Sequence, residues 1–151
     1  MNVFLTVITI ILAVFCIAFG IAESVVYGVN VNNLCGINTT STSTWGYGAP
    51  PLSEWLLGAA IGDLIVGALL GVGLIIALTT DIVPLLIIGA VCGLFEVVWT
   101  SIGIASWLKN GIDCITGNNS IWTMAATRVM TFIGLLPALI VLLPNMKDTI
   151  M

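Results

Sequence analysis

Four long apolar runs dominate this sequence of 151 residues. They cover residues 3–22, 54–79, 82–108 and 121–143. A helix that crosses a bilayer needs about 20 apolar residues to span about 30 Å of hydrocarbon. The runs are continuously apolar and do not alternate with polar positions, which favours helices over the strands of a membrane barrel. The sequence therefore predicts an all-α integral membrane protein, a four-helix bundle that forms one domain over residues 1–151.

The composition excludes several other classes of protein. Hydrophobic residues make up 60% of the chain and charged residues 7%, whereas a soluble domain is about 25% charged. Disorder is excluded as well, because it requires low hydrophobicity and high charge. The three basic residues are Lys109, Arg128 and Lys147. They are too few to neutralise the phosphates of a nucleic acid, so we expect no nucleic-acid partner.

The motifs of common enzymes are missing from the sequence. There is no histidine, which removes the usual residue for acid–base catalysis and a common metal ligand. We find no CxxC pair, no nucleophile elbow and no glycine loop of the kind that holds phosphates. Serine and cysteine occur without a base to activate them. We therefore predict that the protein is not an enzyme and has no cofactor, no metal and no soluble substrate.

Polar segments connect the four predicted spans. The first, residues 23–53, is long and rich in Asn, Ser, Thr and Gly. The second, residues 79–81, is short enough to make a tight hairpin, and the third covers residues 109–119. We expect the first span to be retained and not cleaved as a signal peptide, because it lacks a basic flank and its apolar run is long.

Local signals mark the ends of the spans. Ser53 and Ser120 stand where helix N-caps belong, and Asp81 is placed to cap the third span. Pro137 should kink the fourth span, and Pro144 should help to end it, because proline removes a backbone donor. Three tryptophans near span ends predict an aromatic belt at one membrane interface. They are Trp55, Trp107 and Trp122.

Loops one and three carry features of an oxidising, glycosylating compartment. Asn38 and Asn118 each begin an N-glycosylation sequon. Cys35 and Cys114 lie in the same two loops, so we favour a disulfide between them over free thiols. These features predict that loops one and three face the lumen or the outside, with both termini in the cytosol. Cys16 and Cys92 lie inside spans, where we interpret them as small apolar packing residues.

Glycines recur at the spacing that lets membrane helices approach closely. Span two carries two such pairs and span three carries one. They are Gly58 and Gly62, Gly67 and Gly71, and Gly89 and Gly93. We expect span two to be the central helix of the bundle. The same spacing also suits a contact between two copies of the chain.

Three charged residues lie inside the predicted spans. From the helix rise, Asp63, Glu96 and Arg128 lie about 15, 16 and 12 Å below the same membrane face. A charge at mid-membrane costs at least about 2.5–3.5 kcal/mol. We therefore predict a buried ion-pair cluster, with Met124 and Phe132 beside Arg128. The cluster either fixes the register of the helices or lines a path for protons or cations, and we favour the structural role.

The order of loops resembles that of small tetraspan proteins, the grouping that includes claudins. The shared layout is a long first loop, a short inner hairpin and a shorter third loop. Claudins carry a Trp, a Gly-Leu-Trp motif and two cysteines in the first loop. Here that loop has Trp45-Gly46 and Cys35 alone, so the resemblance does not imply a role in cell junctions. The pattern Trp99-x3-Gly103-x3-Trp107, followed by Asp113-Cys114 and Trp122, is similar to the second half of some uncharacterised animal four-span proteins.

Together these features predict a non-enzymatic tetraspan protein with a structural or assembly role. Its partners would be the lipid bilayer and other membrane proteins or further copies of itself, in a cellular membrane complex or a virion membrane. The alternative is a small channel, or a proton or cation conductor, that uses the charges inside the membrane.

Overall fold

The computed structural model describes the backbone of residues 3–29, 52–117 and 119–150. Within these ranges, nothing is described of the side chains of residues 109–117, 119, 136 and 138–150. The helices are α1 (Val3–Val29), α2 (Leu52–Thr79), α3 (Val83–Gly117) and α4 (Asn119–Ile150). This part of the chain contains no strand, so the prediction of an all-α fold is confirmed for it.

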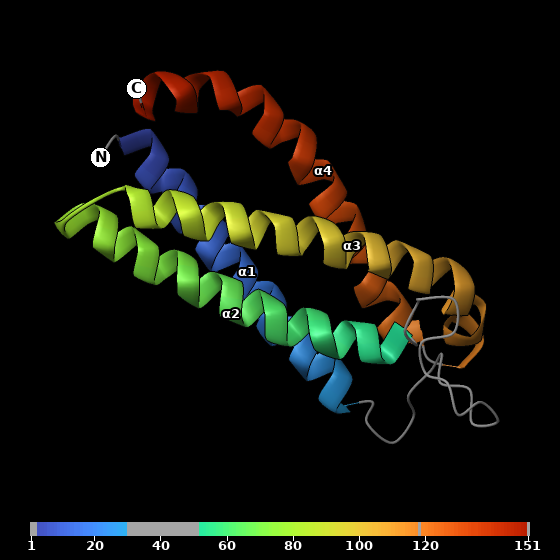
Figure 1. Cartoon of the computed structure of the whole chain (residues 1–151). Helices are drawn as coiled ribbons and strands as arrows, with labels where there is room; N and C mark the ends of the chain where they lie inside the picture. Colours follow the sequence, from blue (N-terminus) through green and yellow to red (C-terminus); the bar gives the residue numbers. More distant parts are fainter. Residues whose placement is uncertain (1–2, 30–51, 118, 151) are drawn as a thin grey trace.

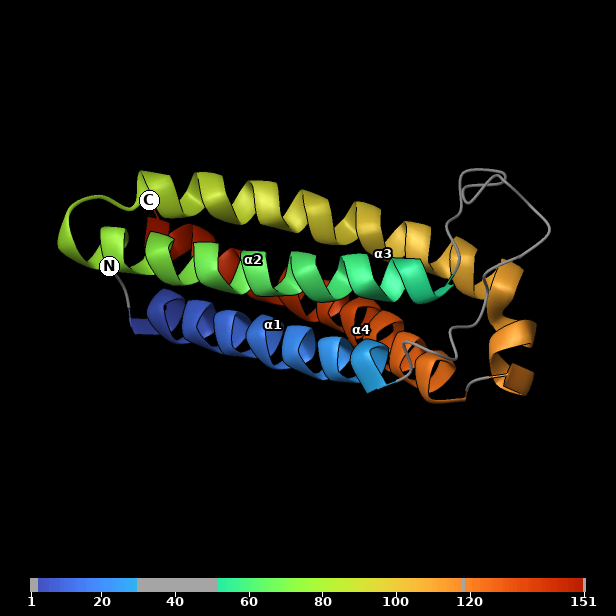
Figure 2. The same ribbon diagram turned by 90° about the horizontal axis from the view of Figure 1, so that it is seen from below.

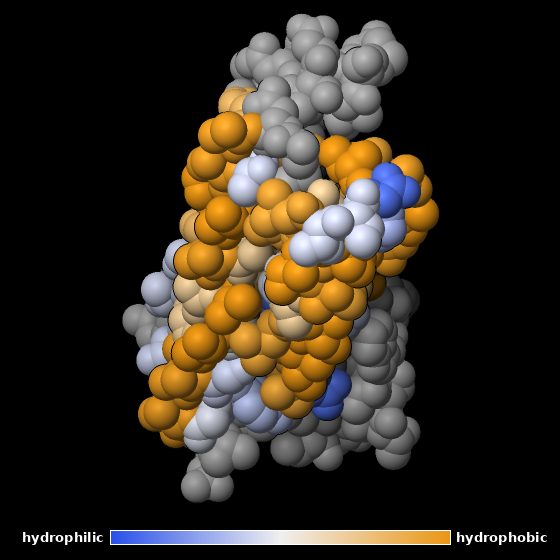
Figure 3. Space-filling model, turned by 90° about the vertical axis from the view of Figure 1, so that its left-hand side faces the viewer, coloured by the Kyte–Doolittle hydropathy of each residue, from blue (hydrophilic) through white to orange (hydrophobic). Residues whose placement is uncertain are grey.

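Three of the helices are long and apolar enough to cross a membrane. They are Val3–Val29, Leu52–Thr79 and Val83–Leu108. Large apolar side chains on these helices are exposed, including Ile11, Val91 and Leu94, and apolar residues cover much of the described face in Figure 3. An apolar surface of this extent is unfavourable in water and fits contact with lipid. The fold is therefore consistent with a multi-pass membrane protein.

The helices form a bundle in which α2 occupies a central place. Figure 2 shows α1, α2 and α3 in a row, with α4 starting beside the end of α1 and then passing behind the row. The α2–α3 hairpin, the start of α1 and the end of α4 lie toward one end of the bundle (Figures 1 and 2). This shared end fits the predicted order of loops.

Residues of α1 and α3 pack directly against glycines on two sides of α2. A Cβ atom at Gly58 or Gly62 would collide with the ring of Trp99 or Phe95 on α3. On the α1 side, a Cβ at Gly67 would lie 3.0 Å from the carbonyl oxygen of Ala13. Backbones can approach this closely only where a side chain is missing. These contacts explain why α2 lies between α1 and α3.

The other predicted packing glycines make no such contact. A Cβ at Gly71, Gly89 or Gly93 would meet no atom within 4 Å. These three glycines therefore do not mediate close helix packing within the described part of the chain, although their spacing matches that of the pairs that do.

The hairpin between α2 and α3 is as short as expected. Thr80 to Ile82 separate the two helices, and the backbone N–H of Val83 donates a hydrogen bond to Asp81 Oδ1 at 3.2 Å. Asp81 thus satisfies a free donor at the start of α3, as predicted. Ser53 and Ser120 are instead the second residues of α2 and α4. An N-cap precedes the first helical residue, so their assignment as N-caps was wrong by two positions.

Three helices continue past the ends of the predicted spans. Helix α1 continues past Glu23 to Val29, α3 continues through most of the predicted third loop, and α4 continues past Pro144 to Ile150. The predicted ends followed the first charged residue or proline. Glu23 is buried inside the bundle, however, and proline removes one helical hydrogen bond without forcing the chain out of the helix. Figure 1 shows α4 bending in its second half, where Pro137 lies.

One tryptophan of the predicted belt is part of the core. Trp55 is fully buried, and its Nε1–H donates to the carbonyl oxygen of Trp99 at 2.8 Å, while Trp99 Nε1–H donates to the carbonyl of Trp55 at 3.3 Å. Placing Trp55 at a lipid interface was therefore wrong. Trp107 and Trp122 pack together across α3 and α4, with ring centroids 5.6 Å apart.

Candidate functional site: a buried charge cluster

The guanidinium of Arg128 on α4 is the centre of a polar cluster inside the bundle. Its Nε and Nη2 donate to the two carboxylate oxygens of Asp63 on α2, at 3.0 and 2.9 Å. Nη2 also donates to Glu96 Oε2 on α3 at 2.8 Å. Nη1 donates to the hydroxyl of Thr100, one turn further along α3, at 3.4 Å. The structure thus brings the three predicted charges together, and the paired bonds to Asp63 fix the plane of the guanidinium.

Glu23 on α1 is a fourth member of the cluster, and our sequence reasoning missed it. Its Oε1 lies 3.5 Å from Arg128 Nε, and both side chains are fully buried. A pattern in the sequence could have revealed it, because Ala13, Cys16 and Gly20 are small residues at helical spacing. They form the buried face of α1, and one further turn along that face reaches Glu23.

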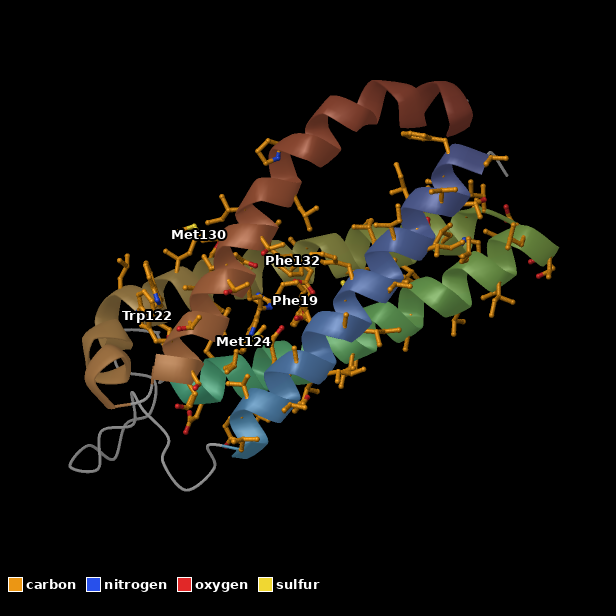
Figure 4. All side chains as sticks on the ribbon, turned by 180° about the vertical axis from the view of Figure 1, so that it is seen from behind. Phe19, Trp122, Met124, Met130 and Phe132 are labelled. Atoms are coloured by element: carbon orange, nitrogen blue, oxygen red, sulfur yellow. The ribbon has the colours of Figure 1, made fainter. Side chains whose placement is uncertain are left out.

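Aromatic rings cover the guanidinium on two sides. The ring centroid of Trp55 on α2 is 5.2 Å from Arg128 Cζ, and that of Phe132 on α4 is 4.6 Å away. Phe132 also packs against Phe19 on α1, with ring centroids 6.0 Å apart (Figure 4). Stacked rings attract a cation and exclude lipid and water. Arg128 therefore lies in a closed site formed by α1, α2, α3 and α4.

The cluster contains more acidic than basic groups. Three carboxyl groups surround one guanidinium among the described residues. Both oxygens of Glu23, and Oε1 of Glu96, are buried and accept no hydrogen bond from an N–H or hydroxyl group in the described part of the chain. A buried carboxylate without full compensation is costly. The arrangement therefore has spare capacity to accept protons or a cationic group.

Most of the other predicted site residues lie outside the part of the chain that the structure describes. Cys35, Asn38 and Asn118 lie among residues that the structure does not describe, and Cys114 lies in α3 without a described side chain. The proposed disulfide and both sequons therefore stay predictions. Two other cysteines, Cys16 and Cys92, are buried and unpaired. In the described ranges, no group of three or more His, Cys, Asp and Glu side chains is arranged to hold a metal ion.

Comparisons of the chain with family models, curated proteins and solved structures found no match.

Proposed function

We propose that the protein is a non-enzymatic four-span membrane protein with a structural or assembly role. The observation that carries this proposal is the single guanidinium of Arg128 held by carboxyl groups from three other helices. Turning any one of these helices would separate a buried charge from its partner, at a cost of several kcal/mol. The cluster would therefore fix the rotation and register of the whole bundle.

The proposal includes α4 as the fourth span, over residues 121–143. Arg128 and Phe132 both face the bundle interior, while Met130 and Ile133 between and beside them are exposed. That pattern suits a helix with lipid on one side and protein on the other. We further propose that loops one and three face the lumen or the outside, which a protease-protection assay on a C-terminal tag would test.

An exposed small-residue face on α3 supports contact with another membrane protein or a second copy. Gly89, Ala90 and Gly93 are exposed, and side chains at both glycines would meet no atom of the described chain. Membrane helices associate through faces of this kind, because small residues let backbones approach.

Crosslinking in native membranes tests the assembly role. A photoreactive residue at Ala90 should yield protein adducts. The same residue at Ile11, an exposed position on α1, is the matched control and should yield lipid adducts. The assembly role would be abandoned if neither position yielded a protein adduct and the protein ran as a lone monomer in mild detergent.

A second candidate function is conduction of protons or cations through the bundle. It is favoured by the excess of carboxyl groups and by the oxygens of Glu23 and Glu96 that accept no hydrogen bond from an N–H or hydroxyl group in the described chain. Purified protein in liposomes should then support a flux that Asp63→Asn abolishes. Liposomes with folded protein and no flux above background would exclude this alternative.

A further inference from the structure

The carboxyl groups of the charge cluster contact one another as well as Arg128. The side chains of Glu23 and Glu96 are each in hydrogen-bonding contact with the carboxyl group of Asp63. Both oxygens of Glu23 and Oε1 of Glu96 are buried, and in the described chain they accept nothing from an N–H or hydroxyl group. Two carboxylates offer only acceptors, so a contact between two carboxyl groups is favourable only when one of them carries a proton.

Asp63 has room to accept a hydrogen bond from both glutamates. An ionised carboxylate offers about four acceptor sites. Arg128 uses one site on each oxygen, because its Nε donates to Oδ2 and its Nη2 donates to Oδ1. About two sites remain, which is one for each neighbouring glutamate. These contacts make Asp63 the best placed of the three groups to stay ionised, since the guanidinium compensates it through two bonds.

The two oxygens of Glu96 have different surroundings. Oε2 accepts from Arg128 Nη2 at 2.8 Å, which the carbonyl oxygen of a neutral acid also does. Oε1 receives no donor in the described chain, so it is the position where a proton would lie. Glu23 is bound less closely, because its Oε1 is 3.5 Å from an Arg128 Nε that already donates to Asp63.

Two protons would make the cluster electrically neutral. Three ionised carboxyl groups against one guanidinium would leave two negative charges in excess. Two of the three acidic side chains are fully buried, and that of Glu96 is 12% exposed. Excess charge at this depth is costly. The other titratable groups that act on these carboxyls are the thiols of Cys16 on α1 and Cys92 on α3, and neither supplies a positive charge.

We propose that Glu23 and Glu96 each retain a proton in the folded protein and donate it to the carboxylate of Asp63. These protons would join α1 and α3 to α2, so the inference deepens and rests on the proposed structural role of the cluster. Loss of either proton would place two carboxylates in contact and push the helices apart. The protons are thus part of what holds the bundle, and the bundle becomes sensitive to alkaline pH.

Infrared spectroscopy of the full chain tests the protonation state. The protein is placed in bicelles of ether-linked phosphatidylcholine, which has no ester carbonyl. A neutral carboxyl group has a C=O stretching band that a carboxylate lacks, and we expect this band at neutral pH. Glu23→Gln and Glu96→Gln should each remove about half of it, and the double variant all of it, because a glutamine amide still donates and accepts in these positions. Asp81→Asn, exposed at the hairpin and outside the cluster, is the control and should leave the band unchanged.

Isotope labelling provides the same information if the variants fail to fold. A heavy carbon isotope in the side-chain carboxyl group of glutamate should shift the whole band of the unchanged protein, and the same label in aspartate should leave it in place. Absence of the band at neutral pH, or a band that moves with labelled aspartate, would overturn the proposal. Crosslinking in membranes reports on assembly separately, so failure of one idea does not imply failure of the other.

A pH titration tests the two protons in order. Glu96 is partly exposed and accepts from Arg128, whereas Glu23 is fully buried, so the band component of Glu96 should disappear first as the pH rises. Stability should fall over the same range, because the folded protein binds more protons than the unfolded one. The unfolding equilibrium constant should rise by up to about tenfold per pH unit for each proton released. The double glutamine variant should lose this dependence. Earlier loss of the Glu23 component, or stability that does not fall at alkaline pH, would refute the proposed role of the protons.

Discussion

The α1–α2 and α3–α4 interfaces use similar residues in opposite ways. Between α1 and α2, Gly20 and Gly67 face atoms so close that a Cβ at either would collide with the neighbouring helix. Beside the α3–α4 interface, Gly89 and Gly93 face open space and line a cavity. The glycine spacing is thus compatible with a closed contact and with an open one. What distinguishes the two cases is the path of the facing helix.

The charge cluster connects the closed and the open interface. Asp63 and Glu23 belong to the closed α1–α2 pair, whereas Glu96 and Arg128 belong to α3 and α4. The side chains of Phe95 and Trp99 are stacked, with ring centroids 6.0 Å apart, and fill the space against α2. The first half of α4 packs in the core through Ile121, Ala125 and Val129, and its interface with α3 is open only further along, beside Gly89 and Gly93. Because α4 supplies the guanidinium that the other three helices contact, it is the helix most dependent on the cluster.

The largest expected effect follows from removing the guanidinium. Arg128→Leu leaves three buried carboxyl groups without a cation, and should lower the free energy of unfolding by about 3–5 kcal/mol. Unfolding in bicelles, followed by steric trapping, would measure it. A variant that also carries Glu23→Gln, Asp63→Asn and Glu96→Gln should regain most of the loss. Wild-type stability of Arg128→Leu would show that α4 does not depend on the cluster.

The next effect tests the closed interface. Gly67→Ala places a methyl group 3.0 Å from the carbonyl oxygen of Ala13 and closer still to Ile17. The two helices must separate, which should cost about 1–3 kcal/mol as overpacking does. The same unfolding measurement applies, with Gly71→Ala on the same helix as the control that meets no atom within 4 Å. Equal stability of both variants would mean that α1 and α2 are not in tight contact.

The third prediction compares how much the carboxyl groups of Asp63 and Glu23 contribute to stability. Asp63→Asn replaces one of the two acceptor oxygens with an NH2 donor, so one hydrogen bond from Arg128 is lost and the other loses its charge assistance, which should cost about 1.5–3 kcal/mol. Glu23→Gln removes a carboxyl group that lies 3.5 Å from Arg128 Nε, further than either oxygen of Asp63, so its cost should stay below about 1.5 kcal/mol. Both are measured by unfolding in bicelles. A larger loss for Glu23→Gln would identify α1, instead of α2, as the main partner of Arg128.

The most useful quantity estimated from the sequence was the depth of each charged residue below the membrane face. The helix rise alone placed Asp63, Glu96 and Arg128 at a similar level, because helix geometry is fixed. Glu23 escaped the same argument, since we ended the first span at the first charge. Charge alone does not end a helix when a partner is available inside the bundle. The partner that compensates Glu23 lies on α4, so only the small-residue face of α1, and not the charge itself, could have indicated from the sequence that the helix continues.

The cavity and the role of each glycine were beyond sequence reasoning for a similar reason. Gly67 and Gly89 both belong to pairs with the same spacing, and a sequence carries no information on which facing helix bends away. In the structure, a Cβ at Gly67 would collide with α1, whereas a Cβ at Gly89 would meet no atom within 4 Å. Trp55 is a related case, because its position near a span end suggested an interface, while the missing side chain at Gly103 leaves room for its ring in the core.

The smallest expected effect tests the open interface directly. Gly89→Ala adds a methyl group where no atom lies within 4 Å, so it creates no clash. Glycine inside a helix costs about 0.5–1 kcal/mol relative to alanine, and this substitution should therefore stabilise the isolated protein by up to that amount. Unfolding in bicelles at low protein density measures the isolated chain. A loss of stability there would show that α4 closes against α3 and that the cavity is absent from the protein in lipid.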